Sequence, residues 1–392
     1  MEVKGQVMET NNAMDQTAQN ARILVLADDF TGACETALPW FDAGWQTSIT
    51  LDFAGTSPAQ IADLDTRYAT AEQARERVAR ALAEADANAM VFKKIDSQWR
   101  GNIHAELTAL AAAGFHLVIA GALPHLNRTV KGGVPLLDGV PLARTDAWKV
   151  ETAKAPEKIS DLLHGMSTTS LPSPEAAGAQ FGALLNDALV HQAVIIDCAT
   201  EADLDAVAAA WLESREPSVL VGTGALNAAL AKIMAQGQPA APEAAREARP
   251  VAGIIGSASG RSGEQLRAAA ADGIHVTETA ADLGKDFPET PALISAPAAP
   301  GDPKTILRTL RNTAQEYLKD HPGSDLFLTG GETARAILND LSITSLAPLK
   351  QLEPGVVICQ APDGRLIGTK PGTFGSTHVL SHALTTLRTL RS

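Results

Sequence analysis

The chain has 392 residues, with 45 Asp and Glu against 32 Lys and Arg, so its formal net charge is −13 at pH 7. This acidic balance argues against a nucleic acid or an anionic membrane surface as partner, because both are bound through excess Lys and Arg. Hydrophobic residues make up 45% of the chain and charged residues 20%, which favours a globular protein over a disordered one. Aromatic residues make up only 4%, so we expect an aliphatic core and no platform for stacking bases.

The cysteines and the amino terminus indicate where the protein resides. Cys34, Cys198 and Cys359 are odd in number and far apart, which fits neither a disulfide framework nor a zinc site built from cysteine pairs. Residues 1–21 are polar and lack the apolar run of a signal peptide. No stretch reaches the ~20 apolar residues of a membrane span. We therefore expect a cytoplasmic protein with a disordered tail over residues 1–21.

The rest of the chain alternates between short apolar runs and longer Ala-rich stretches with helical spacing. In chain order, the predicted elements of the first part are strands at Arg22–Ala27 and Thr47–Leu51, a helix at Ala69–Asp86, strands at Ala89–Phe92, Leu117–Ala120 and Val194–Asp197, a helix at Ala202–Arg215 and a strand at Ser218–Gly222. The later predicted strands are Val251–Ile255, Ile274–Thr277, Ala292–Ser295, Leu326–Thr329, Val356–Gln360 and Leu366–Thr369. Strands that alternate with helices indicate parallel sheets with crossover helices.

The alternation fades at Ala235–Pro250, where Pro, Gln and charged residues replace it. This break predicts a first domain over residues 22–235, a linker over 236–250 and a second domain over 251–392. The predicted fold class is α/β, with two domains each built on a mostly parallel sheet with crossover helices and a ligand cleft between them. Ligands of such sheets bind beyond the carboxyl ends of the strands, so the segments that follow strands are the candidate sites.

Two adjacent acids, Asp28 and Asp29, follow the first predicted strand in the segment Ala27–Ala33, which reads ADDFTGA. A carboxylate at this place can accept a hydrogen bond from a substrate hydroxyl, take its proton or hold Mg²⁺. The simpler alternative is a strand end followed by a helix cap, since Asp is a common cap residue.

Basic residues follow other apolar segments of this acidic chain. Phe92–Gly101 reads FKKIDSQWRG and carries Lys93, Lys94, Asp96 and Arg100. Similar mixtures contain Arg67, earlier in the chain, and Arg128, later in it. At the carboxyl edge of a sheet these side chains would attract a carboxylate or a phosphate, which Arg can bind with two parallel hydrogen bonds. A solvent-exposed charged turn would explain any one of these segments, but the repetition of the same residue mixture favours an anion-binding site.

The second part has three Gly-rich segments after strands: Gly256–Gly263 (GSASGRSG), Thr329–Ala334 (TGGETA) and Gly368–Gly375 (GTKPGTFG). The first lacks one residue and the Lys of a Walker A loop, and no GxGxxG fingerprint is present. Together the three predict a nucleotide site, with Lys370 as a phosphate partner. The nine His residues are dispersed and show no metal-ligand spacing, so we predict no metal site built from protein side chains.

The motifs ADDFTGA, DTR, KKIDSQWRGN, NRTVKGG, GSAS, GGETA and KPGTFG occur in this order between Ile23 and His382. This ordered set resembles the four-carbon acid sugar kinase family, which includes D-threonate, D-erythronate and 3-oxo-tetronate kinases. The resemblance implies an amino-terminal domain that binds the sugar acid and a carboxy-terminal domain that binds ATP, with Mg²⁺ as the expected accompanying ion. It also implies transfer of the γ-phosphate to the terminal (4-)hydroxyl of the acid.

Carried over residue by residue, the resemblance places Asp28 and Asp29 at the substrate pocket, and we expect Asp29, or else Asp28, to accept the proton of the attacking hydroxyl. The substrate set comprises Asp28, Arg67, Lys93, Lys94, Ile95 and Asp96, to which the charge clusters add Arg100 and Arg128. The nucleotide set comprises Ser257, Ser259, Gly330, Gly331, Thr333, Gly355, Lys370, Gly372 and Gly375.

This chain departs from the family pattern in its substrate half. Cys34 and Glu35 stand where many members have Asn-Asp, and Leu123–Arg128 replaces the usual FPxxGR segment. The departures leave open which four-carbon acid is used. Two other functions remain as alternatives: an NAD-dependent sugar-acid dehydrogenase and a sensor that binds sugar acid and nucleotide without turnover. The expected partners are small molecules, with no nucleic acid and no membrane, and a homodimer is left open.

Overall fold

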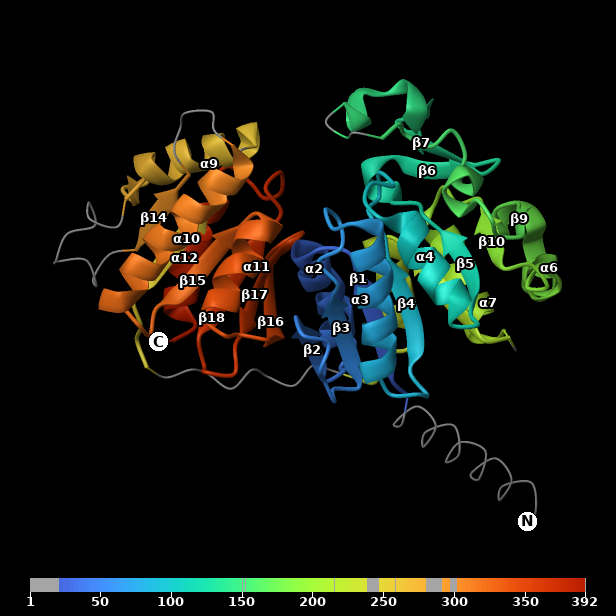
Figure 1. Ribbon diagram of the computed structural model, residues 1–392, viewed down its shortest axis with the longest axis horizontal. Coiled ribbons are helices and arrows are strands. Elements are labelled where there is room, and N and C mark those ends of the chain that lie inside the picture. Colours follow the sequence, from blue (N-terminus) through green and yellow to red (C-terminus); the bar gives the residue numbers. More distant parts are fainter. Residues whose placement is uncertain are drawn as a thin grey trace, which may run out of the picture. The chain divides into compact units, whose positions relative to one another are not determined.

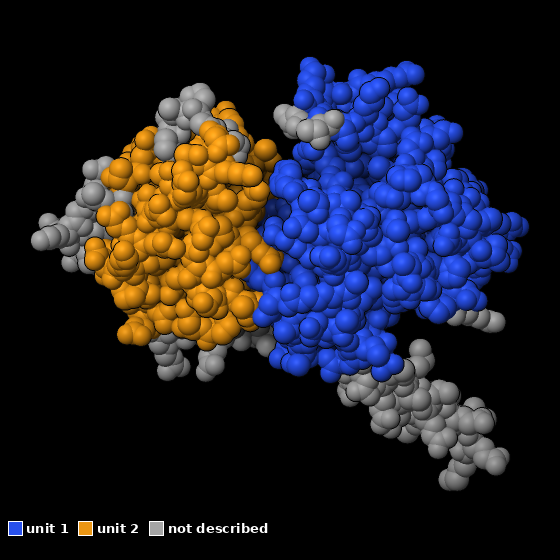
Figure 2. Space-filling view, viewed as in Figure 1, with its two compact units in different colours: residues 1–239 blue, residues 240–392 orange. Residues whose placement is uncertain are grey.

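The computed structural model describes residues 21–149, 151, 153–214, 216–237, 247–257, 259–279, 291–296 and 302–391. The chain divides into two compact units, Met1–Pro239 and Ala240–Ser392 (Figure 2). The predicted tail over residues 1–21 falls almost wholly on residues 1–20, which lie outside the described residues, as do residues 238–246 of the predicted linker.

Unit 1 is built on a parallel sheet with the strand order β2-β3-β1-β4-β11-β5-β10-β9 (Figure 1). Each neighbouring pair in this order is parallel. The strands are β1 (Ile23–Ala27), β2 (Thr47–Thr50), β3 (Ala59–Asp63), β4 (Met90–Lys94), β5 (His116–Ala120), β9 (Thr168–Leu171), β10 (Ala193–Ile196) and β11 (Ser218–Gly222). The central strand β1 reads ILVLA and is buried along its whole length, as expected of a parallel strand covered on both faces.

Helices cover the two faces of this sheet. They are α2 (Phe30–Asp42), α3 (Ala71–Glu84), α4 (Ile103–Ala112), α5 (Pro174–Ala177), α6 (Phe181–Ala188), α7 (Glu201–Leu212) and α8 (Gly224–Ile233). Leu24, Leu26 and Val91 form one hydrophobic cluster with residues of α3 and α4. Because side chains alternate along a strand, the residues between them face the other side, where α8 contacts α2 and α7.

A small antiparallel sheet is inserted between β5 and β9. Its strands are β6 (Arg128–Lys131), β7 (Val134–Leu137) and β8 (Val140–Pro141). Short 3-10 turns flank it at Pro124–Leu126, Leu142–Arg144, Asp146–Trp148 and Ile159–Leu163. The sheet is anchored to β10 because the N–H groups of Gly132 and Gly133 donate to the Asp197 carboxylate at 2.6 and 3.0 Å.

Unit 2 has the strand order β13-β14-β12-β15-β18-β17-β16. The first five strands are parallel and the last two are antiparallel. They are β12 (Val251–Ile255), β13 (His275–Thr277), β14 (Ala292–Ser295), β15 (Asp325–Thr329), β16 (Ser345–Glu353), β17 (Val356–Gln360) and β18 (Leu366–Lys370). The helices are α9 (Gly260–Ala271), α10 (Pro303–Asp320), α11 (Gly331–Asp340) and α12 (Val379–Thr389).

The predicted α/β class with mostly parallel sheets and crossover helices is confirmed. Each strand predicted from the sequence is present within two residues of its expected bounds. The prediction missed β3, β9, β16 and the small antiparallel sheet. Within the described residues, no helix combines the length and the apolar character that crossing a membrane requires.

Candidate active site

In unit 1 the carboxyl ends of neighbouring strands bring together acids and bases that are far apart in the sequence. Asp28 and Asp29 follow β1, Arg67 lies four residues beyond β3, and Asp96 lies two residues beyond β4. Because β3, β1 and β4 are adjacent and parallel, their carboxyl ends meet at one edge. The structure thus places these four predicted residues in direct contact.

Arg67 is the centre of this cluster. Its Nε and Nη2 each lie 2.7 Å from Asp28 Oδ2, its Nη1 lies 3.0 Å from Asp29 Oδ2, and its Nη2 lies 3.8 Å from Asp96 Oδ1. Burial alone would lower the pKa of the guanidinium, but the charges of the three carboxylates outweigh burial and raise it well above its usual value. Arg67 therefore remains a fixed positive charge surrounded by acceptors.

The two acids of the ADDFTGA motif differ in exposure. The Asp28 side chain is 3% exposed and its Oδ1 is buried without a hydrogen-bond partner, whereas the Asp29 side chain is 21% exposed. Asp29 is the N-cap of α2: its Oδ1 accepts from the Gly32 N–H at 3.0 Å, and its Oδ2 accepts from the Thr31 hydroxyl at 2.9 Å. The cap that the sequence offered as the simpler alternative is thus present, beside the contact with Arg67.

Asp96 is held by Arg100 through two hydrogen bonds of 2.8 and 2.9 Å. Burial alone would raise the pKa of Asp96, but the Arg100 hydrogen bond and the charges of Arg67, Arg100 and Lys94 hold it far below its usual range. Asp96 is therefore a permanently charged acceptor. Two of the five N–H donors of the Arg100 side chain are directed at this carboxylate.

The adjacent lysines of β4 point to opposite faces of the sheet. Lys93 Nζ lies 3.2 Å from Glu106 Oε2 on α4, on the α3–α4 face. Lys94 Nζ lies close to Gly32, because a Cβ atom on that glycine would stand 3.5 Å from it. Lys94 is 6% exposed, its recorded hydrogen bond is to Ile95 O at 3.2 Å, and within the described residues no carboxylate lies within ion-pair distance. The predicted pair thus separates into a paired and an unpaired ammonium.

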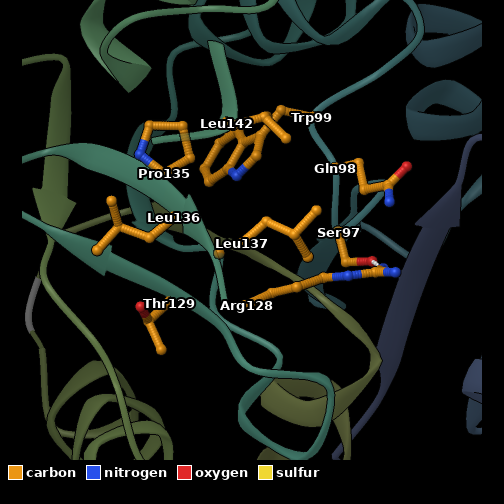
Figure 3. Close-up of a pocket in the computed structure, with 10 residues that line it drawn as sticks. Ser97, Gln98, Trp99, Arg128, Thr129, Pro135, Leu136, Leu137 and Leu142 are labelled. Carbon is orange, nitrogen blue, oxygen red and sulfur yellow. Dashed lines mark hydrogen bonds between the residues drawn. The ribbon is translucent and has the colours of Figure 1, made fainter. Parts of the chain in front are cut away.

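Two other predicted residues have distinct surroundings. Ile95 is 1% exposed and its side chain packs in the core, so only its backbone borders the cluster. Arg128 donates from Nη1 to the Ser97 hydroxyl, beside a cavity of about 10 Å³ that Trp99 and Leu137 help to line (Figure 3). Such a cavity has room for about one water molecule, so Arg128 borders the cluster without opening a ligand pocket there.

Sequence reasoning missed Glu106 and the hydroxyl of Thr66. Glu106 lies in the apolar stretch IHAELTALAA, where a single acid suggests a solvent-facing position, yet it is 1% exposed and accepts a hydrogen bond from Thr66 Oγ1. Thr66 belongs to the predicted DTR triplet, but its hydroxyl was given no role. Only the burial of Glu106 distinguishes it from an ordinary surface acid.

In unit 2 three loops converge after β12, β15 and β18. The hydroxyls of Ser259 and Ser262 donate to Gly372 O at 2.8 and 2.9 Å, and Arg261 Nε donates to Gly375 O at 3.1 Å. Gly330, with φ +86, approaches Ser257, since a Cβ atom on it would stand 3.5 Å from Ser257 N. The structure therefore brings the predicted GSAS, GGETA and KPGTFG segments together.

Close contacts fill the space beside several glycines of these loops. A Cβ atom on Gly256 would stand 2.0 Å from Thr333 Oγ1, and one on Gly372 would stand 2.0 Å from Ser257 Oγ. A Cβ atom on Gly355 would stand 2.6 Å from a ring carbon of Phe374. Gly331 is the first residue of α11, next to Gly330. Every residue predicted for the nucleotide set thus lies in or against these three loops.

Lys370 supplies an ammonium group beside the three converging loops of unit 2. It ends β18, is 0% exposed, and donates to Pro371 O and Gly372 O, each at 3.1 Å. Burial and the nearby charge of Arg261 lower the pKa of Lys370 to about 8, against the opposing effect of Glu353. Its ammonium is satisfied by backbone oxygens rather than by a carboxylate, so it remains suited to an anion.

No group of three or more His, Cys, Asp or Glu side chains suited to a metal occurs among the described residues. Mg²⁺ in phosphoryl-transfer sites is held largely by substrate phosphates with one or two carboxylates. The unpartnered Oδ1 of Asp28 and the neighbouring Asp29 are the oxygen ligands that fit such an ion.

Comparison with known proteins agrees with this division. A family model described as a sugar-binding N-terminal domain matches residues 23–230, and one described as a nucleotide-binding C-terminal domain matches residues 252–380. A D-threonate kinase of Cupriavidus necator is 32% identical over 406 residues, covering 92% of this chain and 96% of the relative. A D-threonate kinase of Bordetella bronchiseptica is 28% identical, covering 94% of this chain and 98% of the relative.

Solved structures share the fold. A protein of Salmonella typhimurium matches with a TM-score of 0.74 and 20% identity, covering 92% of this chain and 98% of its own. A protein of Haemophilus influenzae matches with a TM-score of 0.72 and 18% identity, covering 93% of this chain and 100% of its own. The expected kinase is confirmed at the family level over the dehydrogenase and the sensor. The chain belongs to the four-carbon acid sugar kinase family, and is a sugar-acid kinase, a phosphotransferase.

Proposed function

We propose that this kinase transfers the γ-phosphate of ATP to the terminal (4-)hydroxyl of a four-carbon sugar acid such as D-threonate or D-erythronate. The substrate class is taken from relatives named D-threonate kinase and D-erythronate kinase. The sugar acid binds at the strand ends of unit 1, and ATP binds at the three loops of unit 2.

The observation that carries the proposal is the buried, unpaired ammonium of Lys94. It lies near Gly32, in the first turn of α2, and its Cε would lie 3.8 Å from a Cβ atom on Gly224, the first residue of α8. Thr223, the N-cap of α8, makes no side-chain cap hydrogen bond. Asp29 already caps the start of α2, and the Glu35 carboxylate lies against Gly224 at the start of α8. The support for a substrate carboxylate at this place is therefore the Lys94 ammonium, which has no carboxylate within ion-pair distance among the described residues.

The acids beside Lys94 suit the hydroxyl groups of the substrate. Asp28, Asp29 and Asp96 present carboxylate oxygens around Arg67. Asp29 is the more exposed acid of the ADD pair, so we assign to it the proton of the attacking hydroxyl. Asp28, which is buried against Arg67, orients the guanidinium. Phosphoryl transfer asks chiefly for such positioning and charge neutralisation.

In unit 2 the proposal assigns the ATP phosphates to Lys370 and to the N–H groups at the starts of α9 and α11. Ser259 caps α9 and Gly330 precedes α11, so both helix ends open at the converged loops. Mg²⁺ bound with ATP would neutralise charge on its β- and γ-phosphates. Lys370 would add a positive charge on the protein side.

An ADP-release screen tests the proposal. The full chain is incubated with ATP, Mg²⁺ and, in turn, D-threonate, L-threonate, D-erythronate and the 3-oxo four-carbon acids. We expect ADP release above the ATP-only rate with at least one acid, and phosphorus–carbon coupling at C4 of the product by NMR. Release with none of these acids, or a phosphate at C2 or C3, would contradict the proposed reaction.

Lys94→Met and Arg100→Met separate the two basic groups in the same screen. Because Lys94 is unpaired whereas Arg100 is bound to Asp96, Lys94→Met should raise the KM for the acid far more than Arg100→Met. A loss of a charge-assisted hydrogen bond to the substrate corresponds to about tenfold or more in KM. Equal effects of the two variants would count against Lys94 as the carboxylate site.

A further inference from the structure

Lys93 does not border the substrate cluster; it is directed into the protein. Its side chain is 0% exposed, and its Nζ reaches Glu106 Oε2 at 3.2 Å, Lys94 O at 2.8 Å and Leu26 O at 3.3 Å. These contacts occupy all three protons of the ammonium. Lys93 therefore has no donor left for a ligand.

Glu106 receives this ammonium on one oxygen and the Thr66 hydroxyl on the other. Burial raises the pKa of Glu106, and the charge of Lys93 acts against that rise. A buried ion pair is weak support for stability, because the cost of removing two charges from water offsets their attraction. The residues that the pair holds in place therefore matter more than any stability that it adds.

The pair holds the turn that carries Arg67. Asp65 adopts a left-handed backbone with φ 51, and the N–H groups of Thr66 and Arg67 both donate to Asp28 O, at 2.9 and 3.1 Å. Asn102, just before α4, donates to Thr66 O at 2.7 Å. Glu106 on α4 thus fixes the Thr66 side chain while Asn102 fixes the Thr66 carbonyl.

We propose that the buried Lys93–Glu106 pair is a positioning device for the substrate site: through the Thr66 hydroxyl it locks the 65–67 turn, so that Arg67 stays on Asp28 and Asp29. The pair acts on the substrate only through Arg67. The inference rests on the proposed function for its kinetic readout and on the contacts above for its structural one.

Thr66→Val and Thr66→Ser give the sharpest test, because Val matches the shape of Thr and removes only the hydroxyl. Thr66→Val should raise the KM for the sugar acid about tenfold, because the proposed function places Arg67 in the substrate set. It should lower kcat far less than Asp29→Asn does, because the Asp29 carboxylate is retained. Thr66→Ser should restore the KM. Thr47→Val is the matched control, since it removes a buried hydroxyl that bonds Trp45 O in the same unit, away from this turn.

Hydrogen exchange provides a readout that does not depend on activity. In Thr66→Val, the amides of Thr66 and Arg67 should exchange at least about tenfold faster than in the wild type, while those of β1 and β4 keep their rates. The double variant Lys93→Met/Glu106→Leu replaces the pair by apolar groups. It should remain folded and show the same faster exchange of the Thr66 and Arg67 amides.

The outcomes are distinct. Unchanged exchange in the turn, or an equal KM rise in Thr47→Val, would overturn the positioning role. If wild-type protein phosphorylates no sugar acid, the proposed function fails, and the exchange comparison still decides whether the pair holds the turn.

Discussion

Lys370 allows the proposed nucleotide site to be tested by pH alone. Its side chain is buried, its ammonium donates to two backbone oxygens of its own loop, and burial lowers its pKa to about 8. With that value, about nine-tenths of the molecules carry the charge at pH 7 and about one-tenth at pH 9. If the phosphates require the ammonium, the affinity for ADP should fall about tenfold between these two pH values.

The loss of ADP affinity can be distinguished from a loss of stability, because the two quantities change in opposite directions as the pH rises. The pKa of Lys370 in the folded protein lies below the unfolded value of 10.5, so between pH 8 and 10.5 the unfolded chain binds more protons. Stability therefore rises with pH in this window as far as Lys370 is concerned, while nucleotide binding weakens. Bound phosphate favours the charged form, so the midpoint seen in the complex should lie at a higher pH than in the free enzyme.

Titration calorimetry with ADP from pH 6.5 to 9.5 measures the effect, with Lys370→Met as control. The wild type should lose affinity across pH 8, and the variant should bind weakly at pH 7 with little further change. An affinity of the wild type that stays constant from pH 7 to 9 would refute the reasoning. So would a decline of the same size in the variant.

Three further outcomes are expected. Asp29→Asn should lower kcat by about 10²–10⁴, because Asn keeps the cap of α2 but loses both the base and the ion pair with Arg67; a retained kcat would remove Asp29 from that role. Gly372→Ala should cost about 1–3 kcal/mol of stability, measured by denaturant unfolding, because its Cβ would stand 2.0 Å from Ser257 Oγ; an unchanged midpoint would contradict the packing argument. Glu35→Gln should lower the KM for the sugar acid by about two- to fivefold, because the carboxylate lies against Gly224 beside Lys94; a raised KM would instead mean that it accepts a substrate hydroxyl.

The sequence predicted those strands whose residues are themselves suited to a buried sheet. Runs such as Ser218–Gly222, with three aliphatic residues in succession, were found with their observed bounds. The strand β3 reads AQIAD and was missed, because a single β-branched residue between Ala, Gln and Asp gives no strand signal. Its place next to β1 comes from tertiary packing. The antiparallel strand β16 was missed for a related reason, since Pro348 and Lys350 interrupt its apolar pattern.

The candidate site could be predicted in part because chemistry collects at strand ends in this fold class. That rule selected Asp28, Asp29 and Arg67, which the structure brings into contact. It did not distinguish Lys93 from Lys94, although the alternation of side chains along β4 sends adjacent residues to opposite faces. Glu106 could not be found from the sequence, because only tertiary burial shows that its carboxylate faces a lysine.

The contacts beside the glycines of unit 2 have a consequence for how this part of the chain can evolve. Thr333 occupies the space beside Gly256, and Ser257 occupies the space beside Gly372, so each side chain fills a hollow in a different loop. A mutation that enlarges one partner is accommodated only when the other shrinks, so these positions should change in pairs. Divergence among nucleotide sites of this design would then proceed by coupled exchanges across loops.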